Sequence, residues 1–141
     1  MTWGSWGGHF STKKMRALIE GAMSLGISTF DHADIYGGYT TEKEFGIAFK
    51  ESRIPRENVQ FITKCGIQMP CKERPLPVKH YDYSASHIRS SVENSLLKLQ
   101  TDYIDVLLLH RPSPLIDVAV VAEEFQRLQK EGKVKQLGVS N

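Results

Sequence analysis

The sequence predicts an α/β fold built on a parallel β-sheet. Helix-like stretches alternate with short apolar, strand-like runs, which is typical of right-handed βαβ units. The run 104–109 is too continuously apolar for a sheet with one face in water. Each strand-like run also ends at a polar residue, and the carboxyl ends of parallel strands share one edge of a sheet. The sequence therefore places Asp31, Lys64, His110 and Asn141 at one edge.

The first half of the chain predicts two helix–strand units. Apolar residues at helical spacing predict a helix over 11–25, and the buried strand of this unit covers 27–31. Thr41 and Glu44 match a capping box that begins a second helix. The strand that follows this helix is expected over residues 59–64.

The second half predicts two more such units. Four apolar residues mark a third helix over 88–99, which leads into the strand at 104–109. Asp117 can cap a fourth helix, and a last strand is expected at 134–139. Between the halves lies the proline-containing segment 66–83, and loops of this length are usually functional or disordered.

Composition restricts the kind of protein. The 141 residues are 40% hydrophobic and 24% charged, as in ordinary globular proteins, and we expect one domain over residues 1–141. The formal net charge of +2 argues against a nucleic-acid partner. Two cysteines without a second pair argue against a zinc site and fit a reducing cytoplasm. We therefore expect no metal. The apolar runs are too short for a membrane span, so no membrane partner is expected either.

The polar residues at the predicted sheet edge suggest acid/base chemistry. A buried Lys64 ammonium needs a counter-ion, and Asp31 on the neighbouring strand is the natural partner. A lysine about 4 Å from the phenol of Tyr36 would favour the phenolate by roughly 4 kcal/mol at an effective dielectric constant of about 20. Tyr36 could then protonate a carbonyl oxygen, with His110 bonded to the same oxygen. The hydride for such a reduction implies a nicotinamide cofactor.

Each of these residues, taken singly, also has an ordinary structural explanation. Asp31 could cap a turn, and Tyr36 could be a half-buried aromatic residue. Lys64 could pair with any carboxylate, and His110 could be a core histidine with satisfied hydrogen bonds. Their shared placement at the ends of strands favours the catalytic explanation.

Four motifs carry a resemblance to a known family. They are Phe-Asp-His-Ala-Asp-Ile-Tyr-Gly at 30–37, Thr-Lys-Cys-Gly at 63–66, Leu-Leu-His-Arg-Pro at 108–112 and Gly-Val-Ser-Asn at 138–141. In this order they resemble successive signatures of the aldo-keto reductase family across essentially the whole chain. The resemblance implies a partial (β/α)8 TIM barrel with about the first five strands and four helices of that fold.

The resemblance also implies a function, that of an NADPH-dependent oxidoreductase that reduces an aldehyde or ketone to an alcohol. It implies Tyr36 as general acid/base, Lys64 as the residue that makes its phenol more acidic, and Asp31 as the counter-ion of the lysine. His110 would orient the small-molecule carbonyl substrate. The remaining implied contacts are those of Ser140 and Asn141 with the nicotinamide carboxamide and that of Trp3 with substrate. A core position is the alternative for Trp3.

The predicted barrel would be incomplete. A closed barrel of this type needs eight strands, whereas the chain supplies the end of a first strand and the next four. We therefore expect a partial copy of an enzyme, which could be a truncated gene model, an expressed fragment or a degraded paralogue. The alternative function is a catalytically inactive half-barrel that acts only by association with another chain. Open barrel edges predict self-association.

Overall fold

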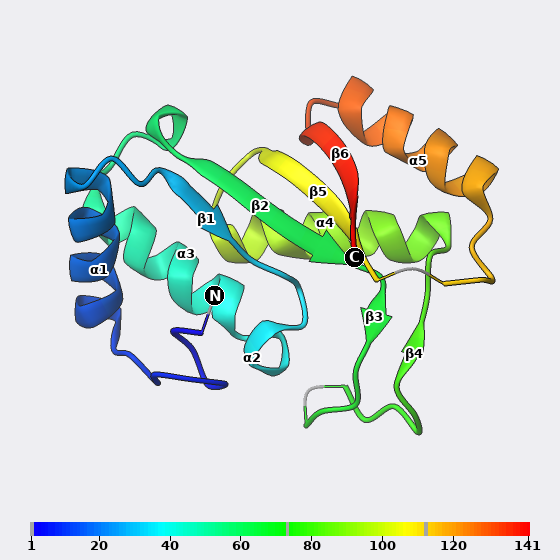
Figure 1. The fold of residues 1–141 in the computed structure, drawn as a ribbon, viewed down its shortest axis with the longest axis horizontal. Coiled ribbons are helices and arrows are strands. Elements are labelled where there is room, and N and C mark those ends of the chain that lie inside the picture. Colours follow the sequence, from blue (N-terminus) through cyan, green and yellow to red (C-terminus); the bar gives the residue numbers. More distant parts are fainter. Residues whose placement is uncertain (1, 73, 112) are drawn as a thin grey trace.

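Four parallel strands form the central sheet of the computed structural model, which describes residues 2–72, 74–111 and 113–141 (Figure 1). The strands are β1 (Thr29–Asp31), β2 (Gln60–Cys65), β5 (Ile104–His110) and β6 (Val134–Ser140). They lie in the order β1-β2-β5-β6, so each strand pairs with the strand before it in this series. The predicted α/β fold is therefore confirmed, and the arrangement is that of part of a barrel wall.

The helices pack in a row against this sheet. The longer ones are α1 (Thr12–Ser24), α3 (Thr41–Ser52), α4 (Ala85–Leu99) and α5 (Val118–Lys130), and the short ones are α2 (Tyr36–Tyr39) and the 3-10 helix η1 (Arg56–Asn58). Helix α3 packs against both α1 and α4, and α4 also packs against α5. Figure 1 shows α4 running behind the strands, while α5 lies beside β6. In the described part of the chain, no helix is long and apolar enough to cross a membrane.

Two apolar clusters fill the space between the helices and the sheet. Phe45 of α3 and Phe61 of β2 are fully buried in the first cluster, with ring centroids 5.5 Å apart. The second cluster lies between β5 and the helices α4 and α5, where Leu107, Ile88 and Leu128 are buried. Burying one such side chain stabilises the folded state by roughly 1.5–3 kcal/mol. These clusters therefore fix the positions of the strands relative to the helices.

The predicted strand at the amino terminus is wrong in the part that the structure describes. Residues 2–10 form turns, in which the amide of Gly7 donates to the carbonyl of Gly4 at 3.0 Å. A Cβ atom at Gly4 would lie 2.5 Å from the Thr41 Oγ1 atom. A residue with a side chain at position 4 would therefore collide with α3. Glycine disfavours strands and permits such turns, which explains why the sheet has four strands rather than five.

The long segment between β2 and α4 is also more ordered than its sequence predicts. It contains an antiparallel pair, β3 (Ile67–Gln68) and β4 (His80–Tyr81), which projects from the carboxyl ends of the main strands (Figure 1). The aromatic rings of Tyr81 and Tyr83 stack with their centroids 6.4 Å apart. This hairpin forms one side of the region where the predicted catalytic residues lie.

The two predicted helix caps have different outcomes. Asp117 caps α5 as expected, because its side chain accepts hydrogen bonds from the amides of Ala119 and Val120. The predicted capping box at the start of α3 is wrong. Thr40 is the cap residue there, and its hydroxyl donates to the carbonyl of Gly37 at 2.9 Å. Thr40 also has φ of −105° and ψ of −29°, whereas a residue whose side chain caps a helix is usually extended.

Candidate active site

Lys64 is the centre of the predicted site. It lies near the end of β2, two residues after Ile62, which pairs with Asp31 of β1. The Lys64 Nζ atom donates to Asp31 Oδ1 at 2.7 Å and to the carbonyl oxygen of His32 at 2.8 Å. It also lies 3.5 Å from the Tyr36 hydroxyl. The Lys64 side chain is only 8% exposed. Burying its charge without a partner would be costly, and the Asp31 carboxylate compensates that charge.

Tyr36 is held near Lys64 by the tight turn that follows it. Gly37 adopts φ of +64°, and a Cβ atom there would lie 2.4 Å from Thr41 Oγ1 and 2.8 Å from Ser5 Oγ. The Ser5 hydroxyl donates to the Gly37 carbonyl at 2.8 Å, so the amino-terminal segment braces this turn. Glycine is required at this position because both the dihedral angle and the close approach exclude a side chain.

The loop before Tyr36 is also fixed from behind the sheet. Asp34 is buried, and one of its carboxylate oxygens accepts a hydrogen bond of 2.7 Å from the Ser91 hydroxyl of α4. The Asp34 amide donates to the carbonyl of Lys64 at 3.0 Å. Burial raises the pKa of the Asp34 carboxyl to about 7. Asp34 therefore connects the loop to β2 and α4.

His110 ends β5 and faces Tyr36. The two rings have centroids 6.0 Å apart and are nearly perpendicular. Burial, followed by the charges of Lys64 and Arg111, lowers the pKa of His110 to about 4. The imidazole is therefore neutral near pH 7, and its buried Nδ1 atom has no hydrogen-bond partner among the described residues. A neutral imidazole still has one N–H group, which can donate a hydrogen bond to a substrate oxygen.

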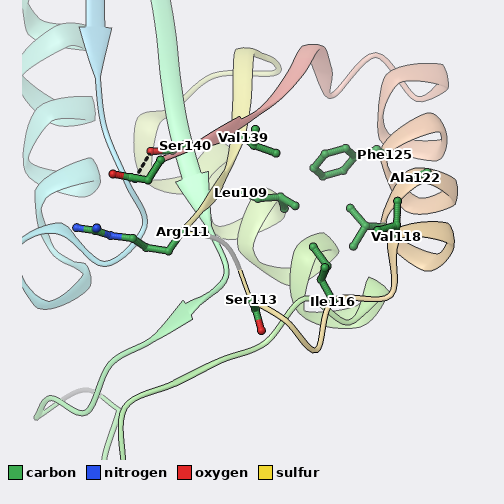
Figure 2. A pocket seen from close by; sticks show the side chains of 11 residues that line it. Leu109, Arg111, Ser113, Ile116, Val118, Ala122, Phe125, Val139 and Ser140 are labelled. Carbon is green, nitrogen blue, oxygen red and sulfur yellow. Dashed lines mark hydrogen bonds between the residues drawn. The ribbon is translucent and has the colours of Figure 1, made fainter.

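Ser140 and Asn141 lie at the carboxyl end of β6, where Ser140 pairs in register with His110. The Asn141 side-chain amide donates to the Ser140 hydroxyl at 2.8 Å. With Leu109 and Arg111 they line one part of a mostly apolar cavity of about 420 Å³ (Figure 2). Together the hydroxyl and the amide offer both donors and acceptors, which match the amide nitrogen and oxygen of a carboxamide. These two residues thus fit the nicotinamide end of the expected cofactor.

The two tryptophans near the amino terminus differ in their surroundings. Trp3 is partly buried and packs against Phe45 in the core, with ring centroids 6.5 Å apart. Its predicted contact with substrate stays a prediction. Trp6 is 51% exposed, and its ring centroid lies 6.4 Å from that of Tyr36. Sequence reasoning missed Trp6 because a strand was expected there, whereas the glycine-rich turns fold this ring onto the loop that carries Tyr36.

His32 lies directly behind the site and is fully buried. Its ring packs between Phe45 and Phe61, with ring centroids 4.4 Å and 6.0 Å away. Neither ring nitrogen has a hydrogen-bond partner among the described residues. Burial, with a further contribution from the charge of Lys64, lowers the pKa of His32 to about 3. The folded protein therefore keeps this imidazole neutral down to acidic pH.

Protonation of His32 predicts a loss of stability in acid. The unfolded chain takes up this proton near 6.5, the ordinary pKa of a histidine, and the folded chain only near 3. Between these values the unfolded state binds more protons, so the free energy of unfolding falls by up to about 1.4 kcal/mol per pH unit as the pH falls. The variant His32→Leu has no imidazole to protonate, so its free energy of unfolding should fall less between these pH values.

Denaturant unfolding of wild type and variant at about pH 7.5 and about pH 4.5 measures this effect. The difference between the two proteins isolates His32 from Asp34, whose raised pKa acts in the opposite direction. His9→Leu, at an exposed histidine, is the matched control. Equal pH dependence in wild type and His32→Leu would refute the prediction.

Comparison of the sequence with known proteins finds enzymes among its relatives. A family model described as the aldo/keto reductase family matches residues 1–141. The uncharacterized oxidoreductase YcsN of Bacillus subtilis is 54% identical over 134 residues, which are 94% of this chain and 45% of that protein. The 6-dehydroglucose reductase of Agrobacterium fabrum is 46% identical over 132 residues, or 93% of this chain and 44% of that protein.

Solved structures agree with these relatives. The holo form of aldo-keto reductase AKR11C1 from Bacillus halodurans superimposes with a TM-score of 0.79 at 31% identity. The match covers 92% of this chain and 42% of that structure. The chain thus spans less than half the length of the relatives and structures named here.

Proposed function

Since the chain belongs to the aldo/keto reductase family, we propose that it carries the catalytic half of an NADPH-dependent enzyme that reduces an aldehyde or ketone to an alcohol. One observation supports this function above the others. The Lys64 ammonium contacts both the Asp31 carboxylate, at 2.7 Å, and the Tyr36 hydroxyl, at 3.5 Å. A phenol beside a buried and compensated cation is suited to donating a proton.

The proposed reaction uses the four residues in distinct ways. Tyr36 donates its phenolic proton to the carbonyl oxygen, and the ammonium of Lys64 stabilises the phenolate that remains. Asp31 pairs with the Lys64 ammonium and directs its Nζ atom toward the phenol. The neutral imidazole of His110 forms a hydrogen bond to the same carbonyl oxygen and so fixes the orientation of the substrate.

In this proposal Ser140 and Asn141 hold the carboxamide of the nicotinamide ring. A bound nicotinamide supplies the hydride that the carbonyl carbon receives. Ser140 ends β6 in register with His110 and Asn141 follows it, and this position supports the assignment. The preference for NADPH over NADH is part of the proposal, as is a location in the cytoplasm.

The proposed function is tested with the intact protein that carries this chain. Oxidation of NADPH is followed by its absorbance in the presence of a panel of small aldehydes and ketones, and the alcohol is quantified in the same samples. We expect one molecule of alcohol for each NADPH consumed. Absence of alcohol across the panel, or NADPH oxidation that is independent of a carbonyl compound, would refute the proposal.

A second candidate role is association through an open sheet edge. Strand β6 is an edge strand of the sheet, and its Val139 side chain is 76% exposed beside the apolar cavity. Exposed edge strands are templates for pairing with another chain. We therefore expect the 141-residue chain alone to self-associate through β6, and a second copy is the proposed partner.

Sedimentation velocity tests this association. Val139→Lys should weaken it, because a charged residue on an edge strand opposes pairing. The matched control is Leu97→Lys, at an equally exposed position of α4 that does not line the cavity. A monomer at all concentrations, or equal association in both variants, would contradict the predicted role of β6.

A further inference from the structure

Arg111 follows His110 in the chain and has an unusual backbone conformation. Its φ is +89°, in a region that residues other than glycine rarely adopt. The hydroxyl of Tyr83 donates to the carbonyl oxygens of both Arg111 and His110, the latter at 3.1 Å. Such a conformation is costly and persists where the surroundings hold it, often at ligand-binding positions.

This backbone directs the Arg111 side chain toward the polar part of the site. Figure 2 shows the guanidinium on the side of Ser140, away from the apolar side chains of Val118 and Phe125. Arg111 is exposed, and no carboxylate of the described residues lies within ion-pair distance of it. A planar guanidinium with unused donors matches the geometry of a carboxylate or a phosphate.

The charges around His110 do not cancel. The charge of Lys64 is offset by Asp31 in an ion pair of 2.7 Å. The charges of Arg111 and, more weakly, Lys79 also lower the pKa of His110, while that of Asp31 raises it. Neither of these two cations forms an ion pair within the described part of the chain. A surplus of positive charge therefore surrounds the residue proposed to orient the substrate.

We propose that Arg111 binds an oxyanion of the carbonyl substrate, so that the enzyme prefers carbonyl compounds that carry a carboxylate or a phosphate. The inference rests on the proposed function, because it assigns a substrate class to the same site. An oxyanion could belong to the substrate or to the diphosphate of the cofactor. The position of Arg111 directly after His110 favours the substrate, since His110 contacts the reacting carbonyl in the proposed mechanism.

Matched substrate pairs test the preference in the intact protein. The pairs are 4-oxobutanoate with butanal and glyceraldehyde 3-phosphate with glyceraldehyde, which differ in the charged group. We expect kcat/KM to be higher for the charged member of at least one pair by about 10- to 100-fold, as charge-assisted hydrogen bonds allow. Arg111→Gln should remove this difference mainly by raising KM for the charged substrate.

Further variants identify the interaction. Arg111→Lys keeps the charge and should retain part of the preference, while Lys79→Gln should lower it less than Arg111→Gln. Lys130→Gln removes one exposed positive charge at the end of α5 and is the matched control, expected to leave the ratio unchanged. Affinity for NADPH, measured by fluorescence, should be the same in all of these proteins.

Each other outcome overturns the inference in a recognisable way. Equal kcat/KM within both pairs, with both members reduced, would refute the oxyanion site and leave the proposed function intact. Weaker NADPH binding by Arg111→Gln, with an unchanged substrate ratio, would assign Arg111 to the cofactor. Absence of turnover with every substrate would refute the proposed function itself.

Discussion

Replacing Tyr36 by phenylalanine is expected to lower the rate of carbonyl reduction by about 10²- to 10⁴-fold, the usual contribution of a general acid. The phenol is the group that Lys64 approaches to 3.5 Å, and in the proposed mechanism it alone supplies the proton. The substitution removes one oxygen atom and keeps the ring, so the perpendicular contact with His110 should persist. Binding of NADPH should change little, because Tyr36 is not among the residues proposed to hold the carboxamide.

Steady-state rates and cofactor affinity, measured on the intact protein, check this expectation. The matched control is Tyr103→Phe, which removes a hydroxyl just before β5, at the opposite end of the strand from His110. This control should keep the wild-type rate. Near-normal turnover by Tyr36→Phe would exclude the phenol as the acid, whatever the control shows.

Replacing Lys64 by methionine is expected to lower the rate by about 10²- to 10³-fold, a loss comparable to that of one electrostatic stabilising group. Methionine keeps the unbranched stem within the sheet but removes the ammonium that bridges Asp31 and Tyr36. The Asp31 side chain is 52% exposed, so water can solvate the carboxylate left behind. Activity should therefore fall much more than stability.

Lys135→Met is the matched control for this substitution. Lys135 also pairs with a carboxylate, that of Asp105 at 3.2 Å, but near the amino end of β6 and remote from Tyr36. It should retain the wild-type rate. Thermal unfolding should show that both variants are folded at the assay temperature. Equal losses of activity in the two variants would contradict a specific role for Lys64.

The strands, and the meeting of Asp31, Tyr36 and Lys64 at one edge of the sheet, could be predicted because both depend on local patterns. Short apolar runs bounded by turn residues identify the four parallel strands within two residues of their ends. Parallel topology then brings the residues at their carboxyl ends to one edge, and the structure places Lys64 against Asp31 and Tyr36 there. The roles of these residues in catalysis remain predictions.

The features that the sequence did not predict depend on contacts between distant segments. The turns of residues 2–10 exist because Gly4 packs onto Thr41, a contact between positions far apart in the chain. The same fold brings Trp6 to Tyr36. The start of α3 differs because the turn at Gly37 leaves Thr40 with φ of −105° and ψ of −29°, and its hydroxyl donates to the Gly37 carbonyl. Local patterns cannot rank such competing partners.

The central claim is that Tyr36 and Lys64 act as one unit on a single proton, and a double-mutant cycle tests it most directly. The rates of wild type, Tyr36→Phe, Lys64→Met and the double variant are measured with one aldehyde and saturating NADPH. Residues that act as a unit show strongly non-additive losses. The account predicts that the double variant is about as slow as Tyr36→Phe alone. Losses that multiply in the double variant would mean that the two residues act independently, and would contradict the account.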